Sequence, residues 1–142
     1  MAKGFSLIEL AVVLLVVGLL TTVGLPRLHD LLDWLATDRA AREVTTALAV
    51  GRHGAVLQAT RARVLIAADT LRIDRLGADG WEPWWGSPGP AASGVRLEVS
   101  NPVVTFGPTG MGWGVSNTKV VLRRGSHVET ITTSRVGRVK RW

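Results

Sequence analysis

The chain has 142 residues, enough for one ordinary domain, and 46% of them are hydrophobic. Its formal charge is +6, from 17 Lys and Arg residues against 11 Asp and Glu. It contains no cysteine, which excludes disulfide bonds and thiolate metal sites, so its stability must come from packing.

An apolar segment lies close to the N-terminus. Between Phe5 and Leu25 the only charged residue is Glu9, and residues 10–20 are apolar without interruption. A helix of this length, at about 1.5 Å per residue, spans about 31 Å and can cross the core of a bilayer. A carboxylate inside such a span costs several kcal/mol unless it meets a partner, so Glu9 predicts a functional role.

Three interpretations of this segment are open. A secretory signal peptide would end at an A-x-A-like site, and residues 21–26 contain none. A plain membrane anchor fits the length but leaves Glu9 unexplained. In the third interpretation, residues 4–9, Gly-Phe-Ser-Leu-Ile-Glu, resemble the prepilin cleavage motif of type IV pilins and type II secretion pseudopilins.

This resemblance implies a processing pathway and an assembly role. A membrane-embedded prepilin peptidase would cut after Gly4 and methylate the new N-terminus, Phe5. Glu9 would pair with the terminal amine of a neighbouring subunit, where an opposite charge makes its burial tolerable. Pro26 matches a family position that kinks or locally melts the helix.

The same resemblance predicts the organisation of the chain. Residues 1–4 would be a cleaved leader, residues 5–26 a transmembrane and filament-core helix, and residues 27–142 an exported head. Because Lys3 lies on the short N-terminal side, the positive-inside rule keeps that end cytoplasmic. We therefore expect a single-pass inner-membrane protein whose head enters the periplasm or a pilus.

After Pro26 the periodicity predicts a second, amphipathic half of the same helix. Apolar or small residues recur every three or four positions from Leu28 to Ala55, which predicts one helix from Phe5 to about Ala59, broken or bent near residues 24–26. Its apolar stripe is formed by Leu28, Leu32, Leu35, Ala36, Ala40, Val44, Leu48, Gly51 and Ala55.

Short strands follow the helix. Alternating or β-branched runs predict strands at residues 64–67, 71–74, 95–99, 103–106, 119–124 and 127–134, with a tight turn at Gly125-Ser126. Residues 77–94 are rich in Gly, Pro and Ser and predict a long loop. The predicted fold class is α+β: a long N-terminal helix packed on a small antiparallel β-sheet head, as in pilins.

Two C-terminal motifs narrow the resemblance. Residues 106–110, Phe-Gly-Pro-Thr-Gly, look like the F-x-P-x-G element of the GspH/FimT family of minor pseudopilins. Residues 130–134, followed by Gly137-Arg138, are similar to that family's last strand and its "GR" tail. The resemblance covers both ends of the chain and leaves residues 60–100 unmatched beyond their strand pattern.

Motifs for enzymatic chemistry are missing from the sequence. The three histidines (His29, His53 and His127) have no metal-ligand spacing, and Asp69, Asp74 and Asp79 lack the EF-hand pattern. The sequence therefore predicts no cofactor, no metal and no enzyme. The tryptophans Trp81, Trp84 and Trp85 could bind a partner or stack on bases, but we favour a role in fixing a loop to the core.

The whole charge excess lies near the C-terminus. Residues 119–142 contain seven basic residues and one acid, which accounts for the net charge of +6. In some FimT-type pilins of DNA-uptake systems a G-R-x-R motif contacts DNA, and here Gly137-Arg138 is followed by lysine at the second arginine position. The candidate DNA-binding residues are Arg135, Arg138, Lys140, Arg141 and Trp142. The alternative is a solvated basic terminus.

The sequence thus predicts a non-catalytic minor pilin or pseudopilin that assembles with other pilins in a filament. In a type IV pilus it would prime assembly and could bind DNA, without sequence preference, for uptake. In a type II secretion system it would sit in a pseudopilus and meet secreted proteins. The basic tail favours the pilus.

Overall fold

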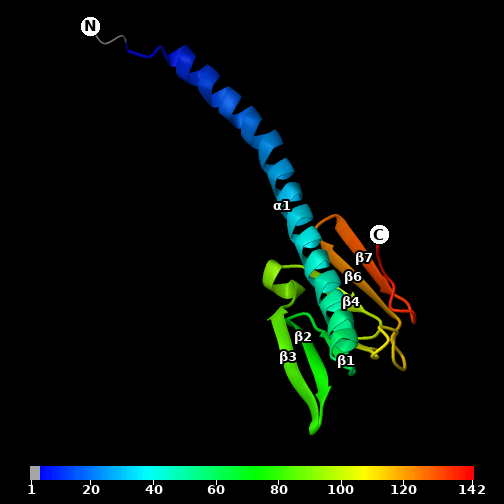
Figure 1. Cartoon of the computed structure of the whole chain (residues 1–142). Helices are drawn as coiled ribbons and strands as arrows, with labels where there is room; N and C mark the ends of the chain where they lie inside the picture. The colour runs from blue at the N-terminus through cyan, green and yellow to red at the C-terminus, as the bar shows by residue number, and fades with distance from the viewer. Residues whose placement is uncertain (1–3) are drawn as a thin grey trace. The chain divides into compact units, whose positions relative to one another are not determined.

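The computed structural model describes residues 4–142, so Met1–Lys3, and with them most of the predicted leader, lie outside the described residues. The chain divides into two units, residues 1–32 and residues 33–142, which are treated separately below. The helix α1 (Leu7–Leu57) contributes residues to both units (Figure 1).

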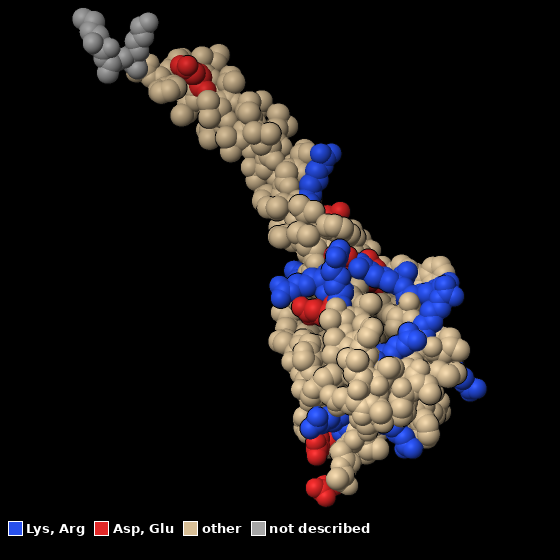
Figure 2. Space-filling model, viewed as in Figure 1, with Lys and Arg blue, Asp and Glu red and all other residues tan. Residues whose placement is uncertain are grey.

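The first unit consists of the N-terminal part of α1. This part is long and apolar enough to cross a membrane (Figure 2), and none of the side chains of its most apolar window is buried. Pro26 has no N–H, so the carbonyl of Thr22 loses its usual helical donor. Nevertheless α1 is not interrupted at Pro26. The break that the sequence suggested is absent, and a bend at this position stays a prediction.

The second unit contains two antiparallel four-stranded sheets (Figure 1). Sheet A has the strand order β3-β2-β1-β5 and sheet B the order β4-β6-β7-β8. The strands of sheet A are β1 (Ala62–Ile66), β2 (Thr70–Gly77), β3 (Gly80–Pro88) and β5 (Val103–Phe106). The strands of sheet B are β4 (Arg96–Val99), β6 (Thr118–Arg124), β7 (His127–Thr133) and β8 (Val139–Arg141). The predicted class, a long helix packed on a small antiparallel β head, is confirmed.

The predicted loop at residues 77–94 was wrong. Most of it forms β3, which pairs with β2 through a hairpin turn closed by Gly77 and Gly80, and a 3-10 helix follows at Pro90–Ser93. Gly80 adopts a φ of 125°, which explains why a glycine ends the turn. Because β3 is an edge strand of sheet A, it tolerates Pro83, which cannot donate to a ladder.

The three tryptophans of β3 pack against the head. Trp85 lies against the hydrophobic core, and the guanidinium of Arg63 lies 4.6 Å from the ring centroid of Trp81. The ring of Trp84 is so close to α1 that a Cβ on Gly54 would come within 2.3 Å of it. These contacts match the expected role of fixing this segment to the core.

The core of the second unit joins one stripe of α1 to both sheets. The buried side of the helix comprises Thr37, Ala40, Ala41, Val44, Ala47, Leu48, Gly51, Gly54 and Ala55. This stripe confirms the predicted helical spacing from Ala40 onward. Leu35 also belonged to the predicted stripe, but its side chain is half exposed, so within this unit the buried face begins at Thr37.

Candidate functional site

The basic C-terminal tail is an ordered strand at the edge of sheet B. Residues 139–141 pair with Thr133, Thr132 and Ile131 of β7, and the backbone N–H and carbonyl of Trp142 both bond to Thr130. The sequence did not predict β8. Its three residues are too few, and too polar, to produce a strand signal without their partner strand.

A tight turn at residues 134–138 brings β8 back along β7. Gly137 has a φ of 73° and its N–H donates to the Ser134 carbonyl at 2.9 Å. A Cβ at Gly137 would come within 2.3 Å of the Gly110 carbonyl oxygen, and Arg52 Nη1 donates to the Gly137 carbonyl at 3.1 Å. A side chain at this position would be strained by the positive φ and would also clash with the Gly110 carbonyl oxygen. The glycine of the Gly137-Arg138 motif therefore has a structural role.

Strand alternation divides the predicted DNA-binding residues between the two faces of sheet B. The inner face packs on the core and includes Val139, while Arg141 points to the same side. Arg138, Lys140 and Trp142 alternate with these residues and therefore share the outer face. Arg135 lies in the turn and is exposed.

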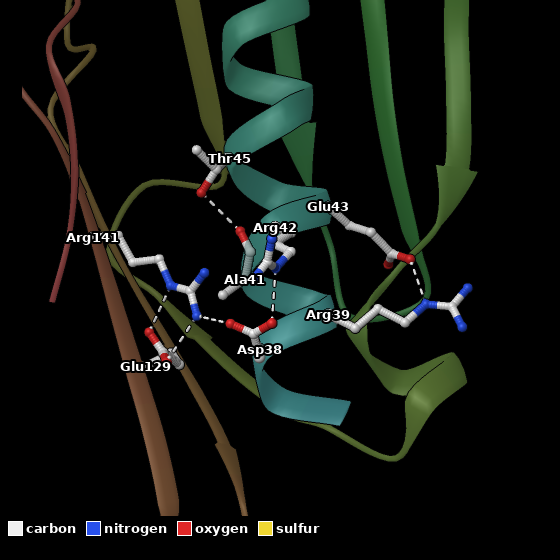
Figure 3. A network of polar contacts seen from close by, with 8 residues as sticks. All are labelled: Asp38, Arg39, Ala41, Arg42, Glu43, Thr45, Glu129 and Arg141. Carbon is white, nitrogen blue, oxygen red and sulfur yellow. Dashed lines mark hydrogen bonds and ion pairs between the residues drawn. The ribbon is translucent and has the colours of Figure 1, made fainter. Parts of the chain in front are cut away.

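Arg141 is held by two carboxylates (Figure 3). Its Nε and Nη2 donate to the two carboxylate oxygens of Glu129 at 2.8 and 2.9 Å, and Nη2 also bonds Asp38 of α1. Arg42 Nε donates to Asp38 at 2.8 Å from the other side. We call Asp38, Glu129 and Arg141 the Arg141 clamp. It connects α1 to both strands of the C-terminal hairpin, so two of the three guanidinium nitrogens of Arg141, Nε and Nη2, already have partners within the chain.

The clamp also shifts two ionisation equilibria. Hydrogen bonds from Arg141 and Arg42 lower the pKa of Asp38 from its ordinary value of 3.8, and bonds to Glu129 and Asp38 raise the pKa of Arg141. Because the Asp38 side chain is 16% exposed and the Arg141 side chain 30% exposed, solvent screens this network incompletely.

The outer residues of the tail are differently placed. Trp142 is 69% exposed, and Lys140 Nζ lies 5.0 Å from the centroid of its ring. Within the part of the chain that the structure describes, Arg138 and Lys140 are in no ion pair. Two cations and an aromatic ring thus face solvent together, an arrangement suited to a phosphate chain with unpaired bases.

The N-terminal motif forms the start of α1. Glu9 lies in the first turn, and its Oε2 accepts a hydrogen bond from the backbone N–H of Ser6 at 3.4 Å. Ser-x-x-Glu is the spacing of a capping box, in which the glutamate satisfies a free N–H at the helix end. Gly4 and Phe5 precede the helix and Phe5 is 82% exposed.

Among residues 4–142, no three His, Cys, Asp or Glu side chains are grouped so that they could hold a metal ion. Asp74, one of three regularly spaced acids, is almost completely buried between Arg63 and Arg72, whose nitrogens lie 2.8 and 2.9 Å from its carboxylate. This carboxylate therefore serves an internal ion pair.

Comparison with known proteins supports a pilin-like fold. No protein-family model matches the chain. A segment of 32 residues, 22% of the chain, is 53% identical to the type IV narrow pilus major component PilA5 of Thermus thermophilus. The matched segment spans 28% of that protein's length.

The similar solved structures come from both kinds of machine. The type IV minor pilin FimU of Pseudomonas aeruginosa superposes with a TM-score of 0.62 and 18% identity, over 73% of this chain and 86% of that chain. The minor pseudopilin EpsH of the Vibrio cholerae type 2 secretion system gives a TM-score of 0.61 and 16% identity, over 75% and 95%. The chain therefore has the fold of these minor pilins and pseudopilins, as its resemblance to the GspH/FimT family implied.

The Arg141 clamp predicts a pH-dependent contribution to stability. Because the pKa of Asp38 is lowered on folding, its stabilising effect is present above pH 3.8 and is lost as the pH falls through the lowered value. At pH 7, Asp38→Asn should cost about 1–3 kcal/mol, as expected for charged hydrogen bonds. Thermal melts of both proteins, followed by tryptophan fluorescence in an uncharged detergent, should therefore converge in acid.

The control is Glu43→Gln, which breaks the exposed pair between Arg39 and Glu43 on the same helix. An exposed pair of this kind contributes less than about 1 kcal/mol. A gap between wild type and Asp38→Asn that stays constant from pH 7 to strong acid would contradict the assignment to the Asp38 carboxylate.

Proposed function

We propose that this chain is a non-catalytic minor pilin or pseudopilin, a subunit of a type IV pilus-like filament. The observation that carries the proposal is the combination, in one chain, of a pilin-fold head with the prepilin-like motif directly ahead of an apolar helix. An apolar N-terminal helix by itself would also fit a membrane anchor or a signal peptide. Neither of those two accounts for Glu9 or for the fold of the head.

The proposal assigns three parts. Residues 1–4 are a leader removed by the prepilin peptidase, residues 5–26 cross the inner membrane and later enter the filament core, and residues 27–142 are exported. Lys3 holds the leader on the cytoplasmic side. The length and apolarity of the first part of α1 support the membrane assignment. In this proposal the exposed apolar side chains of the first part of α1 contact lipid before assembly and other subunits after it.

Processing at the glycine is the first testable consequence. In cells with an active prepilin peptidase, mass spectrometry of the purified protein should show loss of Met1–Gly4 and one additional methyl group on Phe5. Gly4→Leu should prevent the cut, because a side chain would occupy the position of the glycine at the cleavage site. A wild-type chain that keeps its leader in these cells would refute the proposed pathway.

Glu9 combines a local and an intermolecular role in this proposal. Locally it caps the Ser6 N–H; in a filament its second function is to pair with the N-terminal amine of a neighbour. The two roles separate chemically, because glutamine can still accept the capping bond but carries no charge. A single substitution therefore distinguishes them.

We expect Glu9→Gln to keep α1 and membrane insertion intact while lowering incorporation into filaments. Membrane fractionation measures the first property, and quantification of the subunit in sheared filaments measures the second. Glu9→Val, which removes both the cap and the charge, should insert equally well or better, since a desolvated charge is lost. Full incorporation of the Gln variant at an interior filament position would contradict the intermolecular ion pair.

A second candidate function is DNA binding through the outer residues of β8. It is favoured by the placement of Arg138, Lys140 and Trp142 on one solvent-facing side, with Arg135 in the adjoining turn. In this view Arg141 positions the strand through the clamp and does not contact DNA. The alternative is a minor pseudopilin that contacts secreted proteins, and the fold alone is shared by both kinds of subunit.

The tail should bind DNA weakly and without sequence preference. Three or four phosphate contacts imply micromolar or weaker affinity and a steep dependence on salt. Replacing Arg138 and Lys140 together by Gln should flatten the salt slope on duplex DNA by about two, similarly for all sequences. Trp142→Ala should weaken binding to single strands more than to duplex, because unpaired bases offer a free stacking face.

The measurement is fluorescence anisotropy of labelled oligonucleotides with the full chain in an uncharged detergent. The control variant replaces Arg39 and Arg75 by Gln, which removes the same charge from sites outside sheet B. If the tail variant binds as tightly as the wild type, the tail is only a solvated terminus, and the secretion-system alternative gains support.

A further inference from the structure

The outer face of sheet B carries basic residues on all of its strands but β7. The basic residues at outer-face positions are Arg96 on β4, Lys119 and Arg123 on β6, and Lys140 on β8. Each is placed there either by alternation with buried neighbours on its own strand or by pairing with an outer-face residue of the next strand. Arg138 follows the same alternation just before β8. The acid at an outer-face position of these strands is Glu98.

Two of these arginines are placed against each other. Arg96 and Arg123 are direct cross-strand partners between β4 and β6. Like charges in this position repel and destabilise a sheet, unless an anion lies between them. Glu98 offers little compensation, because its Oε1 is 3.7 Å from Arg123 Nε and its side chain is 61% exposed.

Surface hollows mark both ends of the face. One, of about 400 Å³, is lined by Gly94, Arg96, Arg123, Arg124 and Gly125. The other, of about 350 Å³, includes Thr132, Arg138 and Lys140 in its lining. The distances between the cations that lie between the two hollows follow from sheet geometry. Lys119 and Lys140 are two strands apart, which corresponds to about 10 Å, and Lys119 and Arg123 are four residues apart on one strand, which corresponds to about 14 Å.

We propose that the whole outer face of sheet B is one binding surface for the sugar-phosphate backbone of a nucleic acid strand. Arg96, Lys119 and Arg123 extend the candidate site of the tail across the sheet, and the strand would run from one hollow to the other. The proposal rests on DNA binding by the tail and adds residues that the tail motif does not include.

The neutral side chains of the face favour a nucleic acid over a membrane surface. An interfacial membrane site needs an apolar area that can enter the headgroup region. Here the neutral outer-face positions of β6 and β7 are Val121, Val128, Thr130 and Thr132. The two valines give only a small apolar area, and Val121 is partly buried, whereas the two threonine hydroxyls can bond phosphate and sugar oxygens. Trp142 is the aromatic residue beside them, and a single exposed ring beside hydroxyls suits stacking of one base.

The test replaces Lys119 and Arg123 by Gln and leaves the tail unchanged. Full-length protein in an uncharged detergent is titrated with a labelled single strand of about 12 nucleotides at several salt concentrations. Each lost phosphate contact lowers the salt slope by about 0.7 on single strands, so we expect a slope flatter by about 1.4. The control variant Arg39→Gln with Arg75→Gln should keep the wild-type slope.

The outcomes separate the two proposals. A flatter slope in both the Lys119/Arg123 and the Arg138/Lys140 variants, with the control unchanged, supports one surface. A wild-type slope in the Lys119/Arg123 variant with a flatter slope in the tail variant would overturn the extended surface and leave the tail site standing. Wild-type slopes in both variants, or no binding by the wild type, would overturn both. If the Lys119/Arg123 variant kept the wild-type slope on DNA but lost the preference of the wild type for anionic over neutral vesicles, both of which take up α1, the face would be a membrane surface and the extended site would be overturned.

Discussion

The head depends on the close approach of α1 to its two sheets. This approach is possible because the buried stripe of the helix consists largely of alanine and glycine, with Val44 and Leu48 as its larger members. At Gly51 a Cβ would come within 2.4 Å of Val64 Cγ2 of sheet A, and Gly54 faces the ring of Trp84. Glycine inside a helix costs about 1 kcal/mol relative to alanine, and here the cost is offset by packing that a larger residue would prevent.

That approach also determines what happens at the C-terminus. Since α1 lies against the core side of sheet B at Asp38, the carboxylate of Asp38 is available to a residue on the inner side of β8. Arg141 occupies this position and joins the helix to the C-terminal hairpin across 103 residues of sequence. Because Arg141 is held on the inner side of β8, strand alternation places Lys140 and Trp142 on the outer side. The packing of α1 on sheet B therefore determines which basic side chains of the tail face solvent and are accessible to a binding partner.

The sequence predicted those parts of the structure whose signal is local. Helical spacing identified the buried stripe from Ala40 onward, and alternation identified six of the eight strands. It missed β3, because Gly80, Pro83 and Gly86 resemble loop residues and are tolerated in an edge strand that tryptophans fix to the core. It missed β8 because a three-residue strand depends on Gly137 and on the distant Asp38. Because β8 was not predicted, the sequence could not assign the basic residues of the tail to the two faces of a strand. In the structure Arg141 lies on the inner face of sheet B, whereas Arg138 and Lys140 lie on the outer face.

Two populations of charge in the head follow from this arrangement. On sheet A each arginine of the strands is in an ion pair within the sheet: Arg63 and Arg72 share Asp74, and Arg75 pairs with Glu82. On the outer face of sheet B, Arg96 and Arg123 face each other across strands, with one exposed acid nearby. Ion pairs on sheet A can stabilise the fold of the head by itself. On sheet B the repulsion between Arg96 and Arg123 is offset only in part by Glu98, and an anionic partner of the kind proposed above would reduce it further.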